Sequence, residues 1–298
     1  MSRIAYVNGR YVPFAEATVH IEDRGFQFAD GVYDVTEVRG GRLVDEDRHL
    51  ARLRRSLGEL RIVEPMAMSA LGVVLREVVR RNRIRDGLAY IQVTRGSAPR
   101  DHAFPAPAVM PTIVVTARRT RPAARARGET GIAVITVPET RWSRVDIKTV
   151  SLLPNALARQ AAKEAGANEA WFVGPDGFVN EGASSNAWIV TAAGQLVTAP
   201  TSAMILRGIT RTVLLEVAAG QGLELVERRF SVAEARAARE AFVTSATGLV
   251  TPVLTIDASP IGNGAPGATS AALRAALIAR TKLAPVWGGP VAQGSGFG

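Results

Sequence analysis

The chain has 298 residues, of which 47% are hydrophobic and none is cysteine. This length and composition exceed one comfortable core and predict a soluble protein of one large or two medium domains. Without cysteine the chain forms no disulfide, offers no thiolate to a metal and has no thiol nucleophile. Its apolar runs are far shorter than the roughly 20 residues that span a membrane, and its N-terminus has no apolar signal segment. We therefore expect a cytoplasmic protein with no membrane partner.

The net charge of +9 raises the possibility of a nucleic-acid partner, because clustered arginines neutralise phosphates. The arginines are scattered, however. Arg54 and Arg55 alternate with leucines and predict the solvated face of an amphipathic helix, and the basic run 118–127 has no aromatic residue on which a base could stack. A basic nucleic-acid-binding protein stays a remote alternative, and small anionic ligands suit the charge equally well. We predict no metal site, because no metal-ligand spacing links the histidines His20, His49 and His102.

We predict that residues 1–117 form an N-terminal α/β domain in which helices and strands follow the α+β pattern. Asn8-Gly9 separates two alternating runs and is typical of a type I′ hairpin, and Gly40-Gly41 marks a second hairpin. We expect Asp47 to cap a helix over 48–60 and Ser69 to cap another through residue 82. Alternation predicts strands at 88–94 and 112–117.

Residues 118–131 have little apolar periodicity and contain Pro122, Gly128 and several alanines, so we interpret them as an interdomain linker. The second domain is expected over 132–284. Its predicted strands lie at 132–138, 170–173, 178–180, 187–190, 196–198, 241–245 and 252–256. Its predicted helices lie at 154–165, 208–219, 232–239 and 271–282. The glycine-rich residues 285–298 predict a flexible tail.

Lysine is scarce in this arginine-rich chain, which contains only Lys148, Lys163 and Lys282. An amine can lose its proton near neutral pH and form an imine with a carbonyl, whereas a guanidinium cannot. Lys163 and Lys282 lie on predicted helix surfaces. Lys148 lies in an extended run that leads into the helix predicted from residue 154, which makes it the candidate for imine chemistry.

Several other positions suit pyridoxal phosphate, which requires a carboxylate at its pyridine nitrogen and donors around its phosphate. Glu181 at a strand end offers the carboxylate. The run Gly208-Ile209-Thr210 offers free amides at the positive end of a helix dipole, and the hydroxyl-rich turn 244–248 and Arg52 are further phosphate donors. From the residues alone, each of these groups and Lys148 has an ordinary alternative as a cap, a turn or a solvated charge.

At these positions the chain resembles the fold-type IV pyridoxal-phosphate aminotransferases over almost its whole length. The segments that carry the resemblance are 22–33, 49–53, 146–148, 155–166, 168–170, 181–186, 206–211 and 250–252. The resemblance implies a smaller N-terminal α/β sandwich domain and a larger C-terminal α/β domain, like a β-barrel, that binds the cofactor.

The resemblance also implies roles for individual residues. Lys148 would be the catalytic, Schiff-base lysine, Glu181 would pair with the pyridine nitrogen, and Leu206 would pack against the cofactor ring. The phosphate would be held by the remaining cofactor-binding positions, which are Arg52, Gly208, Ile209, Thr210, Ser245, Ala246 and Thr247.

The run Thr94–Pro105 looks like the pattern of the D-amino-acid transaminases. In that subgroup an Arg-x-His pair and an early tyrosine grip the substrate carboxylate, and Arg100, His102 and Tyr33 match them. A guanidinium fork and an imidazole suit a planar carboxylate. The likeness implies a homodimer in which this loop lies over the neighbouring subunit's site. It also implies a ping-pong transfer from a D-amino acid, such as D-alanine or D-glutamate, to a 2-oxo acid. From the residues alone, the alternative interpretation is a surface loop whose charged side chains are solvated and bind no ligand.

Three positions depart from the family pattern. Asp34 stands where the subgroup usually has glutamate, Ala183 replaces a serine, and Ala246 stands where a phosphate-binding threonine often lies. Thr247 or Ser245 are the candidates to replace that contact. Because the change at Asp34 bears on the shape of the pocket, (R)-amines remain an alternative class of donor. Branched-chain L-amino-acid aminotransferases and aminodeoxychorismate lyases share the implied fold and remain alternatives.

Overall fold

The computed structural model of the chain describes residues 3–120 and 122–285, and these form two compact units. One unit contains the described residues of 1–28, 33–119 and 282–298, and the other contains those of 29–32 and 120–281. Residues 282–284, which we expected in the second domain, belong to the first unit. The expected tail beyond Pro285 lies outside the described residues.

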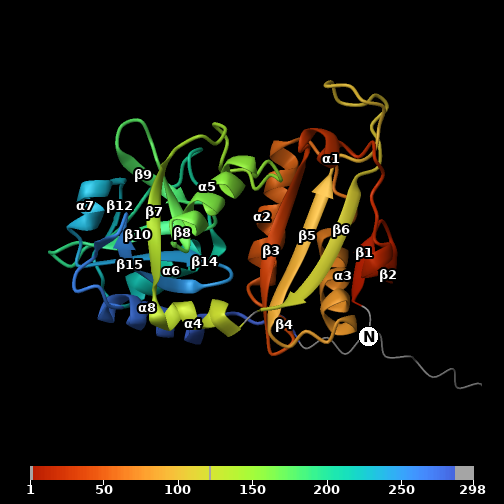
Figure 1. Ribbon diagram of the computed structural model, residues 1–298. Coiled ribbons are helices and arrows are strands. Elements are labelled where there is room, and N and C mark those ends of the chain that lie inside the picture. The colour runs from red at the N-terminus through yellow and green to blue at the C-terminus, as the bar shows by residue number, and fades with distance from the viewer. Residues whose placement is uncertain (1–2, 121, 286–298) are drawn as a thin grey trace, which may run out of the picture. The chain divides into compact units, whose positions relative to one another are not determined.

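A six-stranded sheet is the framework of the first unit (Figure 1). Its strand order among the described residues is β2-β1-β6-β5-β3-β4. Asn8 and Gly9 form the β1–β2 turn with φ of 45° and 90°, as the predicted type I′ hairpin requires. The bounds are β1 (Ile4–Val7), β2 (Arg10–Pro13), β3 (Gly31–Arg39), β4 (Arg42–Leu43), β5 (Gly87–Thr94) and β6 (Thr112–Arg119).

The helices of this unit cover the sheet and begin slightly earlier than predicted. Helix α3 (Met68–Arg81) packs on β1, β5 and β6, and α2 (Glu46–Glu59) packs on α3. The predicted caps were wrong, because α2 begins after Asp45 and α3 after Ala67, which places Asp47 and Ser69 inside the first turns. The short helices η1 (Phe14–Glu16) and α1 (Arg24–Phe28) were not predicted.

The segment 118–131, which we expected to be a linker, is mostly regular structure. Its first two residues end β6, and α4 spans Pro122–Thr130. Proline at the first helical position, several alanines and Gly131 with a φ of 78° explain the helix, because these residues favour a helix start, a helix interior and a helix end.

A curved mixed sheet is the framework of the second unit (Figure 1). Its strand order is β12-β11-β10-β14-β15-β7-β8-β9-β13, with β16 paired to β15. The pairs β7–β8, β7–β15 and β11–β12 are parallel. The bounds are β7 (Ile132–Pro138), β8 (Glu169–Val173), β9 (Phe178–Gly182), β10 (Asn186–Val190), β11 (Leu196–Thr198), β12 (Leu225–Glu227), β13 (Phe230–Ser231), β14 (Glu240–Ser245), β15 (Leu249–Ile256) and β16 (Ser259–Pro260).

Both faces of this sheet are apolar and buried. Trp171 packs edge-on against Phe230 in one cluster, and Trp188 stacks on Phe242 in another. Helices α6 and α8 cover the second cluster, and α5 covers the outer side of β8. Every strand and helix predicted for this region is present. β7 and β11 have the predicted bounds and the others have shifted ends, whereas β12, β13 and β16 were not predicted. The helices are α5 (Leu153–Glu164), α6 (Ile209–Gly220), α7 (Val232–Arg236) and α8 (Ala268–Arg280).

Candidate active site

Lys148 lies on the segment that connects β7 to α5, and main-chain contacts hold this segment in place. Thr149, which follows the lysine, forms a β-bridge with Val32. The Val150 amide donates a hydrogen bond to the Gly31 carbonyl over 3.0 Å. These contacts fix the backbone immediately beside the lysine, so its amine projects from a defined position.

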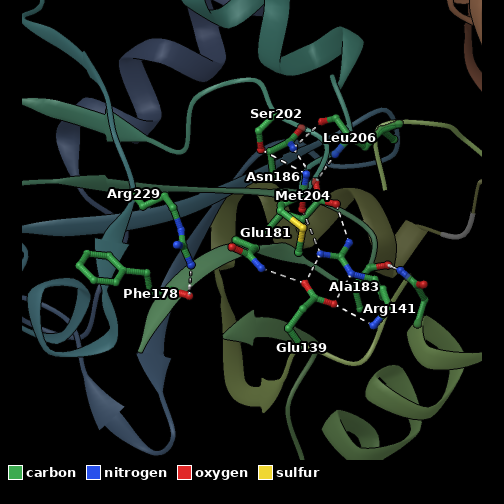
Figure 2. Close-up of polar contacts among 12 residues, drawn as sticks. Glu139, Arg141, Phe178, Glu181, Ala183, Asn186, Ser202, Met204, Leu206 and Arg229 are labelled. Carbon is green, nitrogen blue, oxygen red and sulfur yellow. Dashed lines mark hydrogen bonds and ion pairs between the residues drawn. The ribbon is translucent and has the colours of Figure 1, made fainter. Parts of the chain in front are cut away.

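Glu181 is a buried carboxylate near the end of β9, as the sequence predicted. Its Oε1 accepts a 2.6 Å bond from Arg141 Nη1, and its Oε2 accepts bonds from Asn186 Nδ2 at 2.9 Å and the Leu206 amide at 3.0 Å (Figure 2). Burial raises the pKa of Glu181 to about 7, against the lowering effects of Arg141, the Leu206 amide and Lys148. Lys148 therefore acts electrostatically on Glu181, and the structure brings the predicted amine and carboxylate into one site.

The first turn of α6 lies beside Asn186, the residue that also binds Glu181. Gly208 is the N-cap, and Ile209 and Thr210 are the first helical residues. Main-chain N–H groups in a first turn have no acceptor within the helix, and the helix dipole favours an anion there. A Cβ at Gly208 would come within 2.2 Å of Asn186 Oδ1, so glycine leaves the room that this amide needs.

These residues of the second unit fit pyridoxal phosphate by the chemistry of their groups. Lys148 supplies an amine for the aldehyde, and Glu181 supplies a buried carboxylate for the ring nitrogen. The amides of Ile209 and Thr210 supply donors for a phosphate. The Leu206 amide bonds to Glu181, which places Leu206 next to the carboxylate, as a residue against the cofactor ring requires.

The hydroxyls of the turn between β14 and β15 have partners of their own. Ser245 Oγ and Thr247 Oγ1 lie 3.2 Å apart, and both residues line a small cavity together with the buried Glu169 and Ser185. The roles of Ser245, Ala246 and Thr247 in phosphate binding stay predictions.

Arg52 belongs to the first unit, where Asp34 orients its guanidinium. Arg52 donates from Nε to Asp34 Oδ2 and from Nη2 to Oδ1, both over 2.8 Å, and His49 Nδ1 lies 2.7 Å from Oδ1. Burial opposes a charge on Asp34, but Arg52 and His49 outweigh it and hold the pKa of this carboxyl well below its usual range. The aspartate at this position therefore acts on the orientation of Arg52. This pair was not predicted from the sequence.

The predicted carboxylate-binding residues also lie in the first unit. Arg100 and His102 both contact the ring of Phe28, with the guanidinium carbon 5.0 Å and the imidazole centroid 5.4 Å from its centre. Tyr33 stacks on Tyr90 with centroids 5.7 Å apart. Arg100 and His102 are thus neighbours around one ring, which allows them to act on the same small group, and both are exposed.

Arg24 holds the loop that carries Arg100 and His102, a role that sequence reasoning missed. This arginine is 3% exposed. Its Nη1 donates to the carbonyls of Asp101 at 2.6 Å and Ala103 at 3.2 Å, and its Nη2 donates to that of His102 at 3.3 Å. A charged fork on three successive carbonyls fixes the main chain of the loop. The signal that could have identified Arg24 is its place in the family-like run 22–33.

The model of the family Amino-transferase class IV matches residues 31–256. This match spans β3 to β15 and includes Lys148, Glu181 and the start of α6. The chain belongs to the class IV aminotransferases. The family, the α/β fold and the cofactor, pyridoxal phosphate, are thereby confirmed as the sequence predicted them, whereas the residue roles stay predictions.

Individual relatives of this class IV aminotransferase agree with that assignment. The D-alanine aminotransferase of Bacillus licheniformis is 40% identical over 270 residues, which cover 91% of this chain and 94% of that protein. The D-alanine aminotransferase of Staphylococcus haemolyticus is 38% identical over 263 residues, which cover 88% of this chain and 92% of that protein. Among solved structures, the branched-chain amino acid aminotransferase of Escherichia coli shares the fold with a TM-score of 0.86 at 21% identity, over 94% of this chain and 95% of that one.

Two further observations concern the part of the class IV aminotransferase that the structure describes. No helix in residues 3–120 and 122–285 is both long enough and apolar enough to cross a membrane. Within the same residues, no three histidine, aspartate or glutamate side chains are grouped so that they could bind a metal ion.

Proposed function

We propose that this class IV aminotransferase transfers the amino group of a D-amino acid, such as D-alanine or D-glutamate, to a 2-oxo acid. The contact of both Arg100 and His102 with Phe28 supports the proposal, because a neighbouring guanidinium and imidazole can bind one carboxylate. The identity of 40% with a D-alanine aminotransferase supports it. Each product is the 2-oxo acid of the donor or the amino acid of the acceptor, so no further reactant is needed.

The proposed roles follow from the chemistry of each side chain. Pyridoxal phosphate, when bound, supplies an aldehyde for the imine and a ring that withdraws electrons from the substrate α-carbon. Lys148 Nζ would move the proton from that carbon to the carbon of the former aldehyde in the first half-reaction, and in the opposite direction in the second. Glu181 would hold the proton of the ring nitrogen, and the amides of Ile209 and Thr210 would bind the phosphate. Arg52 is a further proposed phosphate donor.

We also propose a homodimer in which the Arg100 loop serves the neighbouring subunit's site. Arg100, Asp101 and His102 are exposed on the single chain, and Arg24 fixes their main chain without covering the side chains. Mass measurement by light scattering tests the dimer, and a monomer with full activity would exclude it. We propose a cytoplasmic location because a chain without cysteine gains nothing from an oxidising compartment.

A donor panel tests the substrate proposal. The cofactor's visible absorption reports each half-reaction when the holoenzyme is mixed with D-alanine, L-alanine, D-leucine, L-leucine or (R)-1-phenylethylamine. We expect the D-amino acids to react fastest. Preference for L-leucine would instead assign a branched-chain aminotransferase, and preference for the amine, which has no carboxylate, would assign an (R)-amine transaminase.

Arg100→Ala separates carboxylate recognition from general damage. This variant should lower kcat/KM for D-alanine by about a hundredfold, the value of a lost charge-assisted pair, and leave any amine turnover unchanged. Arg10→Ala, at an exposed arginine on β2, is the matched control and should behave like the wild type. Equal losses for D-alanine and the amine in Arg100→Ala would contradict the proposed role.

A further inference from the structure

Glu139 and Arg141, on the segment after β7, surround Glu181 with an arrangement that the roles above do not explain. The Arg141 side chain is 4% exposed and the Glu139 side chain 7%. Burying a carboxylate and a guanidinium costs free energy unless both are paired and hydrogen-bonded. This pair lies directly behind the carboxylate to which we assign the ring nitrogen, so its geometry bears on the state of Glu181.

Glu139 accepts three hydrogen bonds from Arg141, two from its guanidinium and one from its main-chain amide. It accepts from Arg141 Nε at 2.9 Å and from Nη2 at 2.6 Å, and the Arg141 amide also donates to Glu139 Oε1 at 2.9 Å (Figure 2). Asn180 Nδ2 donates to Glu139 Oε2 at 3.0 Å. The guanidinium lies over the Phe172 ring, 4.3 Å from its centre. With its plane fixed by these contacts, Arg141 directs Nη1 at Glu181.

The two carboxylate oxygens of Glu181 have different partners. Its Oε2 accepts from Asn186 and the Leu206 amide, which fill the two lone pairs of that oxygen. Its Oε1 accepts from Arg141 Nη1 at 2.6 Å. A ring N–H that binds Glu181 would therefore share Oε1 with the guanidinium, so Arg141 acts on the same oxygen as the proposed partner.

The charges of the group do not cancel. One guanidinium faces the two carboxylates of Glu139 and Glu181, which leaves a net charge of −1 when both are ionised. Lys148 also acts on Glu181, but its amine is the reacting group in the proposed function. The remaining negative charge suits a protonated aromatic nitrogen, since an Arg141 paired to Glu181 alone would neutralise the carboxylate.

We propose that Glu139 and Arg141 are positioning residues that set the proton affinity of Glu181: Arg141 favours the ionised carboxylate, and Glu139 limits how much of its charge the guanidinium cancels. This inference rests on the proposed role of Glu181 towards the ring nitrogen. The segment 139–141 would thus control how strongly the site binds a cofactor whose ring nitrogen is protonated.

The two residues should shift the titration of Glu181 in opposite directions. Glu139→Gln removes a negative neighbour, so Arg141 acts more strongly and the pKa of Glu181 falls. Arg141→Gln removes the positive neighbour, so the pKa of Glu181 rises. Charged neighbours at such distances shift a pKa by about 1 to 3 units. A purely structural role would weaken cofactor binding in both variants without moving the titration in opposite directions.

The experiment measures cofactor retention as a function of pH. Holoenzyme is equilibrated at a series of pH values, and the pyridoxal phosphate released through an ultrafiltration membrane gives the dissociation constant. Retention should increase as Glu181 loses its own proton. We expect the midpoint of this increase to move down by about one pH unit in Glu139→Gln and up by at least that amount in Arg141→Gln. The ionisations of free pyridoxal phosphate are the same in every experiment and cancel in the comparison.

Controls separate the possible failures. Arg141→Lys keeps the charge without the fork and should return the midpoint towards the wild-type value. If Arg141→Gln does not fold, the downward shift in Glu139→Gln tests the inference. Glu139→Asp is the corresponding control that keeps the charge at position 139. If Glu181→Gln keeps normal retention with the wild-type pH profile, the proposed role of Glu181 fails. If Glu181→Gln abolishes the pH dependence but both neighbour variants keep the wild-type midpoint, the inference about Glu139 and Arg141 alone is overturned.

Discussion

The guanidinium of Arg24 donates a hydrogen bond to the main-chain carbonyl of His102, 3.3 Å away and 78 positions later in the sequence. A buried arginine thus supports the main chain of an exposed histidine. Arg24 also lies over the Phe28 ring, the same ring that Arg100 and His102 contact. The proposed carboxylate grip therefore depends on a residue that does not bind substrate.

Replacing Arg24 should loosen this loop. In Arg24→Met three carbonyls lose a charged donor, so we expect KM for D-alanine to rise about tenfold with a smaller change in kcat, the equivalent of one hydrogen bond of about 1.4 kcal/mol. Steady-state kinetics measure both constants. Arg24→Lys keeps the charge but not the fork and should lie between the two. An unchanged KM in Arg24→Met would show that the loop is ordered by other contacts.

Asp34→Asn should release Arg52. The neutral amide cannot balance the buried guanidinium, so we expect the free energy of unfolding at neutral pH to fall by about 3 kcal/mol and cofactor release to become faster. Urea denaturation and ultrafiltration measure the two effects. Glu64→Gln, which weakens the exposed pair with Arg54 on the same helix, should change stability by less than about 1 kcal/mol. Similar losses in both variants would contradict the special role of the buried pair.

The pKa of Glu181 predicts how the stability of cofactor-stripped protein depends on pH. Burial raises this pKa to about 7 in the folded chain, against the ordinary glutamate value of 4.5, so the folded protein binds the proton more tightly than the unfolded one. Its contribution to stability is complete below about 4.5 and is lost as the pH rises to about 7. Urea titrations should show this loss, on the order of 1 to 3 kcal/mol, in the wild type but not in Glu181→Gln. Parallel pH profiles of stability in the wild type and Glu181→Gln would exclude this contribution of Glu181.

Asp34 should act in the opposite sense at lower pH. Its pKa is depressed in the folded chain, so its contribution is present above the unfolded value near 3.8 and is lost as the pH falls towards the folded pKa. In acid titrations followed by circular dichroism, Asp34→Asn should therefore lose less stability below about pH 4 than the wild type. If the variant loses stability at low pH as steeply as the wild type, other carboxylates are responsible for the acid unfolding.

Gly208→Ala should disturb Asn186, since the new Cβ would lie 2.2 Å from Asn186 Oδ1. We expect the amide to move away from Glu181, with a loss of about 1 to 3 kcal/mol in stability and weaker cofactor retention. Gly220→Ala is the control at the other end of α6, where a Cβ has no neighbour within 4 Å, and it should stabilise the helix by up to about 1 kcal/mol. Equal retention in both variants would contradict the steric argument.

Lys148→Ala should abolish turnover and the cofactor's visible response to D-alanine, because no amine remains for the imine or for proton transfer. Lys163→Ala removes another of the chain's few lysines, at an exposed position on α5, and should leave both properties unchanged. Absorption spectra before and after D-alanine provide the measurement. A response retained in Lys148→Ala but lost in Lys163→Ala would reverse the assignment.

Local chemistry made much of the fold predictable from sequence. Asn8-Gly9 specifies its hairpin because asparagine and glycine tolerate the positive φ that the turn needs. The strands of the second unit are apolar runs of strand length bounded by turn residues. Helix α4 was missed because its alanines carry no apolar periodicity, although proline at its start and glycine after its end were visible. The five-residue helix α1 is too short for any period to emerge.

The candidate site also has one part that the sequence predicted and another that only the structure revealed. Lys148, Glu181 and the start of α6 were predicted because their residue types suit imine chemistry, a ring-nitrogen partner and an anion site, and because they match a family motif. The pairs Arg24–His102, Asp34–Arg52 and Arg141–Glu181 join arginines to partners on other elements, and in a chain so rich in arginine nothing in the sequence distinguishes a buried guanidinium from a solvated one. Only the folded structure makes that distinction.

One short segment between β7 and α5 supplies both Lys148 and the Glu139–Arg141 pair that faces Glu181. The amine and the groups around the carboxylate are therefore inherited together. A crossover between related genes within β7 or α5 would move them as a single cassette and preserve their spacing. A crossover or a one-residue deletion between positions 141 and 148 would separate them, and natural chimaeras of this family should avoid that interval.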